Sequence, residues 1–202
     1  MSGQRVIILG AGLGRRMGGP KVLKSFQGKT FLERILDRCE ESRSPVILTH
    51  NPQSHSPLEA LLDGFLHSTL PRLVSVPGEA TMLDSLRAGL EAGDPSGGFW
   101  CWPVDAPFIS PRGWQQATAA ANSDPGAIWK LRVAGKTGHP IWFPGWAAPG
   151  IIAGNWPRVE ERGLLGFLDQ HQDKVRILAL EGELLADFNS PDQLAALEGE
   201  HS

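Results

Sequence analysis

The chain has 202 residues, of which 41% are apolar and 20% are charged, and this balance is typical of a globular protein with a core of ordinary size. The net charge of −3 and the isoelectric point near 6.1 give no basic field, so we expect no nucleic-acid partner. The two cysteines, Cys39 and Cys101, are too few for a disulfide framework and fit reduced core thiols of a cytoplasmic protein.

Strand and helix patterns alternate along the chain. Apolar, often β-branched runs bounded by turn residues predict strands at residues 5–9, 45–49, 72–76, 99–104 and 175–180. Apolar residues at helical spacing predict helices near residues 29–41, 58–66, 82–92, 111–121, 163–171 and 192–198. Two more strand-like runs, 127–133 and 138–143, flank the turn-prone residues 134–137 as a hairpin does. The first apolar run is too short for a signal peptide or a membrane span, so the sequence predicts neither export nor a membrane partner.

This order of elements predicts an α/β fold. We expect a three-layer α/β/α, Rossmann-like arrangement with a mostly parallel sheet and a small hairpin insertion. Right-handed crossovers place the carboxyl ends of parallel strands on one edge, so the loops after residues 9 and 104 should emerge together. The sequence contains no repeat and no linker, which favours a single domain over residues 1–202.

A glycine-rich loop, G-A-G-L-G-R-R-M-G-G-P-K at residues 10–21, follows the first predicted strand. Its glycines let the backbone approach a ligand closely, and N–H groups ahead of a helix suit phosphate oxygens. Arg15, Arg16 and Lys21 add three cations. The loop is not a dinucleotide fingerprint, whose third glycine would fall at Arg15. It is not a Walker loop either, because after Gly14 and Gly19 it offers Pro20-Lys21-Val22 where Lys followed by Ser or Thr is required. The alternative interpretation is a flexible surface turn with solvated arginines.

Asp105 follows the predicted strand at residues 99–104, within the sequence W-P-V-D-A-P. A carboxylate at the ligand edge, opposite a phosphate loop, can hold Mg²⁺, which takes one or two protein oxygens and completes its shell with phosphate and water. The alternative is a turn or helix-capping residue. The sequence therefore predicts a site for Mg²⁺ and phosphate between the two loops.

The segment at residues 9–21 resembles the signature loop of the nucleotidyltransferases related to molybdenum cofactor guanylyl- and cytidylyltransferases. The resemblance runs from residue 6 to residue 197 and implies a GT-A-like fold, with a nucleotide-binding half at residues 1–110 and an acceptor-binding half at residues 111–202. It implies that Arg16 and Lys21 stabilise charge during transfer. The nucleotide-binding residues that it implies within the loop are Leu9, Gly10, Ala11, Gly12, Gly14 and Arg15, where Gly10 replaces the usual alanine.

The resemblance also implies metal ligands. Asp105-Ala106-Pro107 is similar to the metal-binding motif at a strand end of the family, and D-F-N-S-P at residues 187–191 looks like a second family motif. The residue before Ser-Pro supplies a second metal ligand in relatives, which implies Asn189 here, with Asp187 as the alternative. A helix start at Ser190 explains part of the same pattern without a metal.

Two further segments bear on the substrates. Asp84 and Ser85 open a predicted helix after Gly78, and this segment resembles the one that contacts the base in cytidylyltransferases. An ordinary amphipathic helix is an equal alternative for the segment. His139, in G-H-P, resembles a residue on the acceptor side of the molybdenum cofactor cytidylyltransferase branch.

Together these patterns predict a cytoplasmic, Mg²⁺-dependent nucleotidyltransferase. It would move a nucleoside monophosphate from an NTP, with CTP favoured, to a small phosphorylated acceptor, with a molybdopterin-like acceptor favoured. A sugar-phosphate or isoprenoid-precursor nucleotidyltransferase is one alternative, and a non-catalytic nucleotide-binding module is another. A dehydrogenase is disfavoured because residues 49–51, Thr-His-Asn, supply no acidic residue after the second strand. The base, the acceptor and the choice between monomer and homodimer stay open.

Overall fold

The computed structural model describes residues 4–65 and 70–181, with the backbone alone at Arg16. The strands of the main sheet are β1 (Arg5–Gly10), β4 (Val46–His50), β5 (Arg72–Ser75), β6 (Phe99–Pro103), β7 (Ile128–Val133), β8 (Lys136–Phe143) and β9 (Val175–Ala179). The helices are α1 (Phe31–Glu41), α2 (His55–Asp63), α3 (Met82–Glu91), α4 (Pro111–Ser123), α5 (Ala147–Ala153), α6 (Val159–Arg162) and α7 (Leu164–Gln170).

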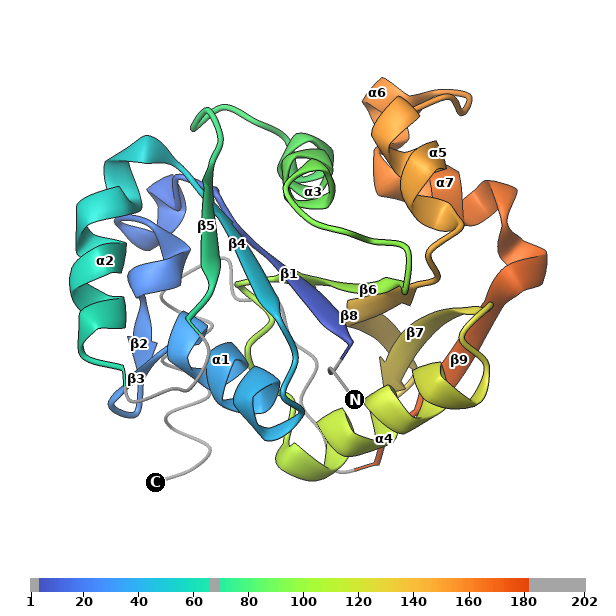
Figure 1. Ribbon diagram of the computed structural model, residues 1–202, viewed down its shortest axis with the longest axis horizontal. Coiled ribbons are helices and arrows are strands. Elements are labelled where there is room, and N and C mark those ends of the chain that lie inside the picture. The colour runs from blue at the N-terminus through green and yellow to red at the C-terminus, as the bar shows by residue number, and fades with distance from the viewer. Residues whose placement is uncertain (1–3, 66–69, 182–202) are drawn as a thin grey trace.

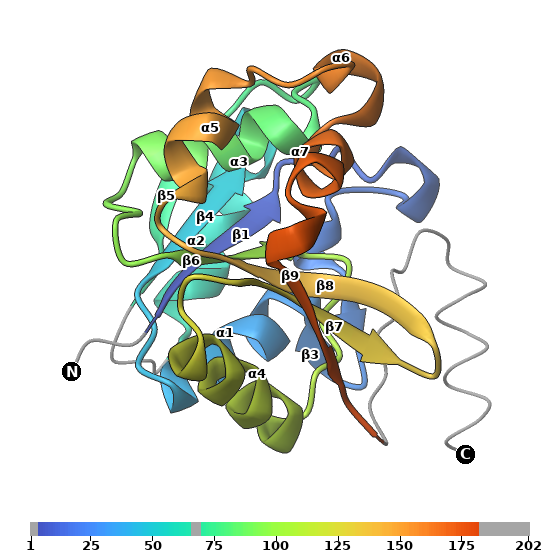
Figure 2. The same cartoon turned by 90° about the vertical axis from the view of Figure 1, so that its right-hand side faces the viewer.

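The seven strands form one sheet in the order β5-β4-β1-β6-β8-β7-β9. β8 pairs antiparallel with both of its neighbours, and all other described pairs of this sheet are parallel. Helices cover both faces, with α1 and α4 on one side and α3, α5 and α7 on the other (Figures 1 and 2). The predicted α/β fold with a mostly parallel sheet is confirmed.

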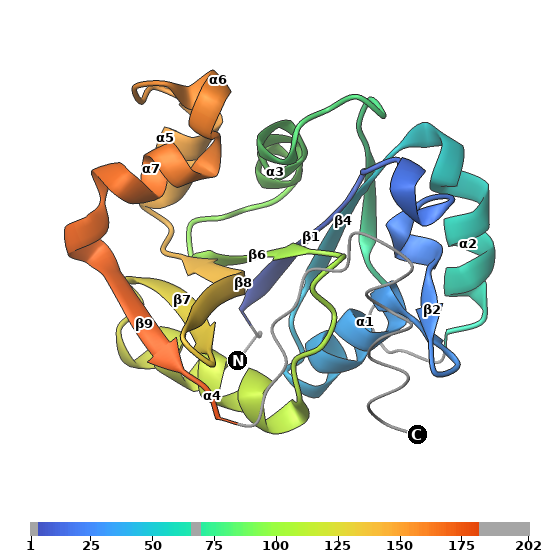
Figure 3. The ribbon, with the colours of Figure 1, turned by 180° about the vertical axis from the view of Figure 1, so that it is seen from behind.

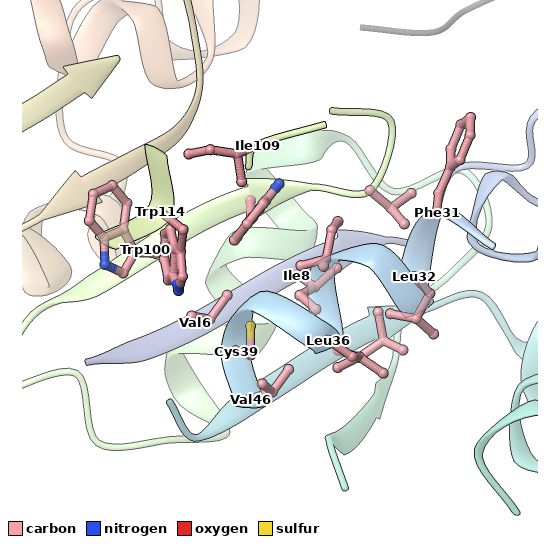
Figure 4. Close-up of a cluster of buried hydrophobic side chains, with 14 of the residues drawn as sticks. Val6, Ile8, Phe31, Leu32, Leu36, Cys39, Val46, Trp100, Ile109 and Trp114 are labelled. Atoms are coloured by element: carbon pink, nitrogen blue, oxygen red, sulfur yellow. The ribbon is translucent and has the colours of Figure 1, made fainter. Parts of the chain in front are cut away.

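Side chains of the central strand β1 alternate between two cores. Val6 and Ile8 pack with residues of α1, α2 and α4, whereas Ile7 and Leu9 pack with residues of α3, α5 and α7. This alternation follows from the two-residue period of a strand that is buried on both faces. Figure 4 shows the first of these cores, where the apolar stripe of α1 meets the sheet.

Four tryptophans and both thiols lie in the interior. Trp100, Trp102 and Trp142 on the strands and Trp114 on α4 are fully buried. Both cysteines are buried and free, and burial raises the pKa of the Cys101 thiol to about 12. These thiols are therefore inert core groups, as the sequence predicts.

The strand order places a topological switch point between β1 and β6. The chain leaves β1 toward β4 and β5 and then returns to β6 on the other side of β1 (Figure 3). Connections diverge at such a point and open a crevice at the carboxyl ends of the strands. The glycine-rich loop follows β1 and Asp105 follows β6, so both emerge at this crevice.

The structure differs from the sequence predictions at several elements. The predicted hairpin at 127–143 exists, but its strands β7 and β8 join the main sheet rather than forming a separate insertion. The proline- and tryptophan-rich stretch at 144–157, for which the sequence pattern predicts no element, contains helix α5. A small hairpin of β2 (Ser25–Phe26) and β3 (Lys29–Thr30) also forms, and the predicted helix at 192–198 lies outside the described residues.

Local sequence explains the small hairpin and the start of α1. Gln27 and Gly28 both have positive φ, as a two-residue hairpin turn requires. Thr30 then caps α1 in a capping box with Glu33, so the helix begins at Phe31 and not at Lys29. Within residues 4–65 and 70–181, no helix has the length and apolar character needed to cross a bilayer.

Candidate active site

The glycine-rich loop curls back on itself after β1. Gly14 has φ +58°, and its carbonyl oxygen accepts hydrogen bonds from the N–H groups of Met17 (2.8 Å) and Gly19 (3.2 Å). A Cβ atom at Gly14 would lie 2.0 Å from the carbonyl oxygen of Gly19. Since both the positive φ and this contact exclude a side chain, the curl of the loop requires glycine at this position.

The far end of the loop is fixed by packing on the strand ends. Val22 is fully buried, and a Cβ atom on Gly10 would lie 2.5 Å from its Cγ1 atom. The absence of a side chain at Gly10 therefore lets the 3₁₀ turn Lys21–Leu23 approach the end of β1. This contact sets the position of Lys21 at the edge of the sheet.

Asn51, which sequence reasoning did not single out as a site residue, ties the loop to the end of β4. Its side chain is fully buried, and Nδ2 donates a hydrogen bond to the carbonyl oxygen of Ala11 at 3.2 Å. Its Oδ1 accepts the backbone N–H of Ser54 at 3.1 Å. A polar residue directly after a strand at the ligand edge is the sequence signal that points to such a role.

Lys21 and Asp105 meet across the crevice. The Nζ atom of Lys21 lies 2.6 Å from Oδ2 of Asp105, and the two side chains are only 18% and 20% exposed. Partial burial lowers the local dielectric, which strengthens this ion pair relative to one at the surface. The two loops that the sequence predicts at one edge are thus joined by their charged residues.

A cavity of about 140 Å³ lies beside this ion pair. Six of the predicted site residues line it, namely Leu9, Ala11, Gly12, Lys21, Ser85 and Asp105. Ala80, Met82, Pro103 and Val104 complete the lining. Sequence reasoning missed these four because small and apolar residues give no chemical signal, and only the fold brings them to the crevice.

Other predicted residues lie near this cavity without lining it. Arg15 extends into solvent and lies 3.6 Å from Glu79, an ion pair so exposed that it contributes little stability. Gly78 packs against Leu13, since a Cβ atom there would lie 3.0 Å from Cδ2 of Leu13. The side chain of Arg16 is not described, and Asp187 and Asn189 lie outside the described residues.

Asp84 serves as a helix cap at the start of α3. Its Oδ2 accepts hydrogen bonds from the hydroxyl of Thr81 at 2.7 Å and from the N–H of Thr81 at 2.9 Å. These bonds, with a smaller contribution from Arg87, hold the pKa of Asp84 below its ordinary value. The neighbouring Ser85 is buried, and its hydroxyl donates to the Thr81 carbonyl oxygen at 3.0 Å.

A second cavity, of about 560 Å³, lies between α3 and the α6–α7 segment. Asp84 and His139 both line it, and Met82 lines this cavity as well as the smaller one. None of the seven tryptophans lines either of these two cavities. The predicted acceptor residue therefore lies in a space next to the crevice that holds Lys21 and Asp105.

Comparison with known families identifies the family of this chain. The sequence profile of the MobA-like NTP transferase domain matches residues 6–175. The chain belongs to the MobA-like NTP transferase family. It is therefore a nucleotidyltransferase, as the resemblance of the glycine-rich loop implies. No curated protein matches the chain.

Solved structures support the fold of this NTP transferase. Rv0371c from Mycobacterium tuberculosis H37Rv is 24% identical with a TM-score of 0.77, and the match covers 97% of each chain. CMP:2-keto-3-deoxy-manno-octonic acid synthetase in complex with CTP is 12% identical with a TM-score of 0.75, over 98% of this chain and 100% of the other. The 4-diphosphocytidyl-2C-methyl-D-erythritol synthase from Anaerococcus prevotii DSM 20548 is 16% identical with a TM-score of 0.74, over 99% and 96%.

The donor set of the NTP transferase fits a divalent cation at Asp105. The described residues contain no group of three or more His, Cys, Asp or Glu side chains that could hold a metal. Mg²⁺ does not need such a group, because one or two carboxylates suffice when phosphates and water complete the octahedron. The ammonium group of Lys21 already lies 2.6 Å from the Asp105 carboxylate, so this carboxylate is placed to receive positive charge.

Proposed function

We propose that this NTP transferase moves a nucleoside monophosphate from an NTP to a small phosphorylated acceptor in the presence of Mg²⁺. The observation that carries the proposal is the contact between Lys21 and Asp105, beside a glycine-rich loop at the topological switch point. Together these groups offer backbone N–H donors, an ammonium group and a carboxylate within one crevice. A triphosphate with its metal needs these three partners.

In the proposed reaction, an oxygen of the acceptor phosphate attacks the α-phosphorus of the NTP. The new P–O bond forms as the bond from the α-phosphorus to the oxygen bridging toward the β-phosphorus breaks, and that oxygen leaves with its electron pair as pyrophosphate. No oxidant and no covalent protein intermediate is needed. The protein accelerates such a transfer by positioning the reactants and by stabilising charge.

The chain's own residues divide this task. The glycine-rich loop holds the triphosphate through backbone N–H groups, and Lys21 and Arg16 offset its negative charge. Asp105 holds the cation, with Asn189, or alternatively Asp187, as the second ligand. Bound Mg²⁺ would supply charge neutralisation at the phosphates. A manganese complex of Rv0371c supports a divalent cation at this fold.

For the base, we favour CTP. Ser85 lines the small cavity and Asp84 opens α3 beside it, as the resemblance to the base-contacting segment of cytidylyltransferases implies. The synthetase solved with CTP and the diphosphocytidyl-methylerythritol synthase share this fold. Oδ2 of Asp84 is engaged in the cap and the hydroxyl of Ser85 already donates to the Thr81 carbonyl oxygen, which leaves the backbone near Gly78 as the stronger candidate for base contact.

For the acceptor, we favour a molybdopterin-like phosphate bound near His139, as the resemblance of the G-H-P segment implies. A sugar-phosphate or isoprenoid-precursor acceptor is the alternative within this class, since two enzymes of this fold act in sugar-acid and methylerythritol chemistry. A non-catalytic nucleotide-binding module is the alternative of another class. We further propose a single domain over residues 1–202 that works in the cytoplasm, without nucleic-acid or membrane partners.

The test is pyrophosphate release from CTP, GTP, UTP and ATP, with Mg²⁺ and a panel of phosphorylated acceptors that includes molybdopterin species. Asp37→Ala is the matched control for Asp105→Ala. The carboxylate of Asp37 also forms an ion pair with a lysine, Lys29, at 2.7 Å, but Asp37 lies on α1 and does not line the small cavity. Release that Asp105→Ala abolishes and Asp37→Ala preserves would support transfer. Tight NTP binding with no release on any acceptor would favour the binding module, and no NTP binding at all would refute the proposal.

A further inference from the structure

The larger cavity differs in chemistry from what a sugar or another polyol would require. Most of its wall is formed by apolar side chains of α3, α7 and β8 and by Val159, the first residue of α6, while polar and charged side chains complete the lining. The apolar residues include Leu83, Leu86, Ile141, Leu164, Leu165 and Leu168. Its volume of about 560 Å³ is within the range of small-molecule sites. Helices α3, α6 and α7 lie on the same face of the sheet (Figures 1 and 2).

Exposed apolar residues gather at this cavity. Met82 is 49% exposed and Leu165 is 58% exposed, and both line it. Globular proteins rarely expose a cluster of large apolar side chains to water unless the cluster binds a ligand or a partner. The patch therefore favours a bound apolar group over empty, water-filled space.

Among the charged residues at the cavity, Asp84 and both arginines are engaged in ion pairs, whereas Glu160 is exposed to solvent. The Nε atom of Arg87 donates to the carbonyl oxygen of Ile151 at 3.0 Å, and its guanidinium lies 3.7 Å from Asp84. Arg162 lies 2.6 Å from Asp169. Hydroxyl groups of a ligand that faced the leucine side chains would lose their hydrogen bonds to water. This desolvation cost would weaken the binding of a ligand with many hydroxyl groups.

We infer that this cavity receives an apolar body of the acceptor, either an aromatic ring system or an aliphatic chain. The acceptor is then a phosphate monoester whose phosphate end reaches the small cavity at Lys21 and Asp105, while its body lies against the leucine wall. Met82, which lines both cavities, marks the junction between the two parts. This inference rests on the proposed nucleotidyl transfer, since only that reaction requires the acceptor phosphate at the small cavity.

The experiment compares two phosphate monoesters of equal charge, 1-naphthyl phosphate and glucose 1-phosphate, by isothermal titration calorimetry on the full chain. We expect 1-naphthyl phosphate to bind about tenfold more tightly, because its rings bury apolar area that the sugar does not. Leu165→Gln should weaken 1-naphthyl phosphate by about fivefold and leave glucose 1-phosphate unchanged. Leu70→Gln is the matched control, because Leu70 is 54% exposed but does not line this cavity.

Equal affinities for the two esters, or tighter binding of the sugar, would overturn the inference. So would a loss of 1-naphthyl phosphate binding that is the same for Leu165→Gln and Leu70→Gln, because it would place the rings elsewhere. Pyrophosphate release is measured separately with Asp105→Ala, which removes transfer but leaves the leucine wall intact. Preferential naphthyl binding without pyrophosphate release on any acceptor would therefore count against the proposed function alone.

Discussion

The two cavities at the crevice differ in size, in lining and in how their residues are held. The smaller one, of about 140 Å³, is lined by loop backbone, by the ion pair of Lys21 and Asp105 and by small side chains. The larger one, of about 560 Å³, has five leucines from α3 and α7 in its wall. The first is built from the two loops that follow the neighbouring strands β1 and β6, together with the start of α3, and the second from α3, β8 and the α6–α7 segment.

This difference separates the shared chemistry of the family from the choice of acceptor. Phosphate and metal chemistry is the same for every NTP, and the small cavity supplies it with backbone, one cation and one carboxylate. The body of an acceptor varies, and the wall that would meet it is mostly apolar. A substitution at the first region should therefore affect all substrates, whereas one at the second should affect the choice among them.

The largest expected effect is at Lys21. Lys21→Met removes the cation from the small cavity and leaves the partly buried Asp105 carboxylate without this partner. We expect pyrophosphate release to fall by about 10²- to 10³-fold for every NTP and acceptor, because charge stabilisation is lost at the transferred group. Lys29→Met, which removes an exposed lysine of another ion pair, is the control. A fall that depends on the acceptor would place Lys21 in acceptor choice and break the comparison.

A second prediction concerns the curl of the glycine-rich loop. Gly14→Ala should raise the Kd for NTP by about tenfold or more and lower the free energy of unfolding by about 1–3 kcal/mol. The physical reasons are the φ of +58° and the carbonyl oxygen of Gly19, 2.0 Å from the added Cβ. Gly97→Ala is the control, because its Cβ would meet open space. Calorimetry and thermal unfolding measure the two effects, and unchanged NTP affinity would show that the loop shape is not needed.

Asn51 gives a third and more local test. Asn51→Asp keeps the oxygen that caps Ser54 but replaces the Nδ2 donor by an acceptor beside the Ala11 carbonyl oxygen. We expect the free energy of unfolding to fall by about 1–3 kcal/mol, because the buried carbonyl loses its partner. NTP affinity should fall with it, as seen by calorimetry. Normal affinity at reduced stability would restrict Asn51 to a structural role.

The smallest effect is expected at Asp84. Asp84→Ala should lower the free energy of unfolding by about 0.5–1 kcal/mol at pH 7, at the low end for a cap because the side chain is half-exposed. The folded state holds the pKa of Asp84 below its ordinary 3.8. The stabilisation is therefore present above pH 3.8 and is lost as the pH falls through the lowered pKa. Urea titrations of both proteins at several pH values measure this difference.

The same variant sharpens the question of base recognition. If Asp84 acts only as a cap, Asp84→Ala leaves the ratio of CTP to GTP turnover unchanged. A shift in that ratio, at unchanged stability, would instead give Asp84 the contact with the base that the family resemblance implies.

Particular residues show how far the sequence alone reaches. The strand–loop–helix order and the sequence at 9–21 predict the crevice and the proximity of Lys21 to Asp105, because the carboxyl ends of parallel strands meet at one edge. The Q-G turn and the T-x-x-E cap carried enough signal for the small hairpin and for the start of α1. Helix α5 carried little such signal, because its sequence A-A-P-G-I-I-A contains a proline and a glycine, which disfavour a helix interior.

The sequence by itself determined the chemistry of the small cavity, because the glycines of the loop, its cations and the carboxylate all belong to short local motifs. Only the tertiary structure decided the larger cavity. The leucines of α3 and α7 each follow an ordinary helical pattern, and no spacing shows that they face one another across about 560 Å³. The hydrophobic effect is non-directional, so an apolar helix face can be buried against many different partners. The packing of whole helices and strands therefore decides which leucines stay accessible to a ligand.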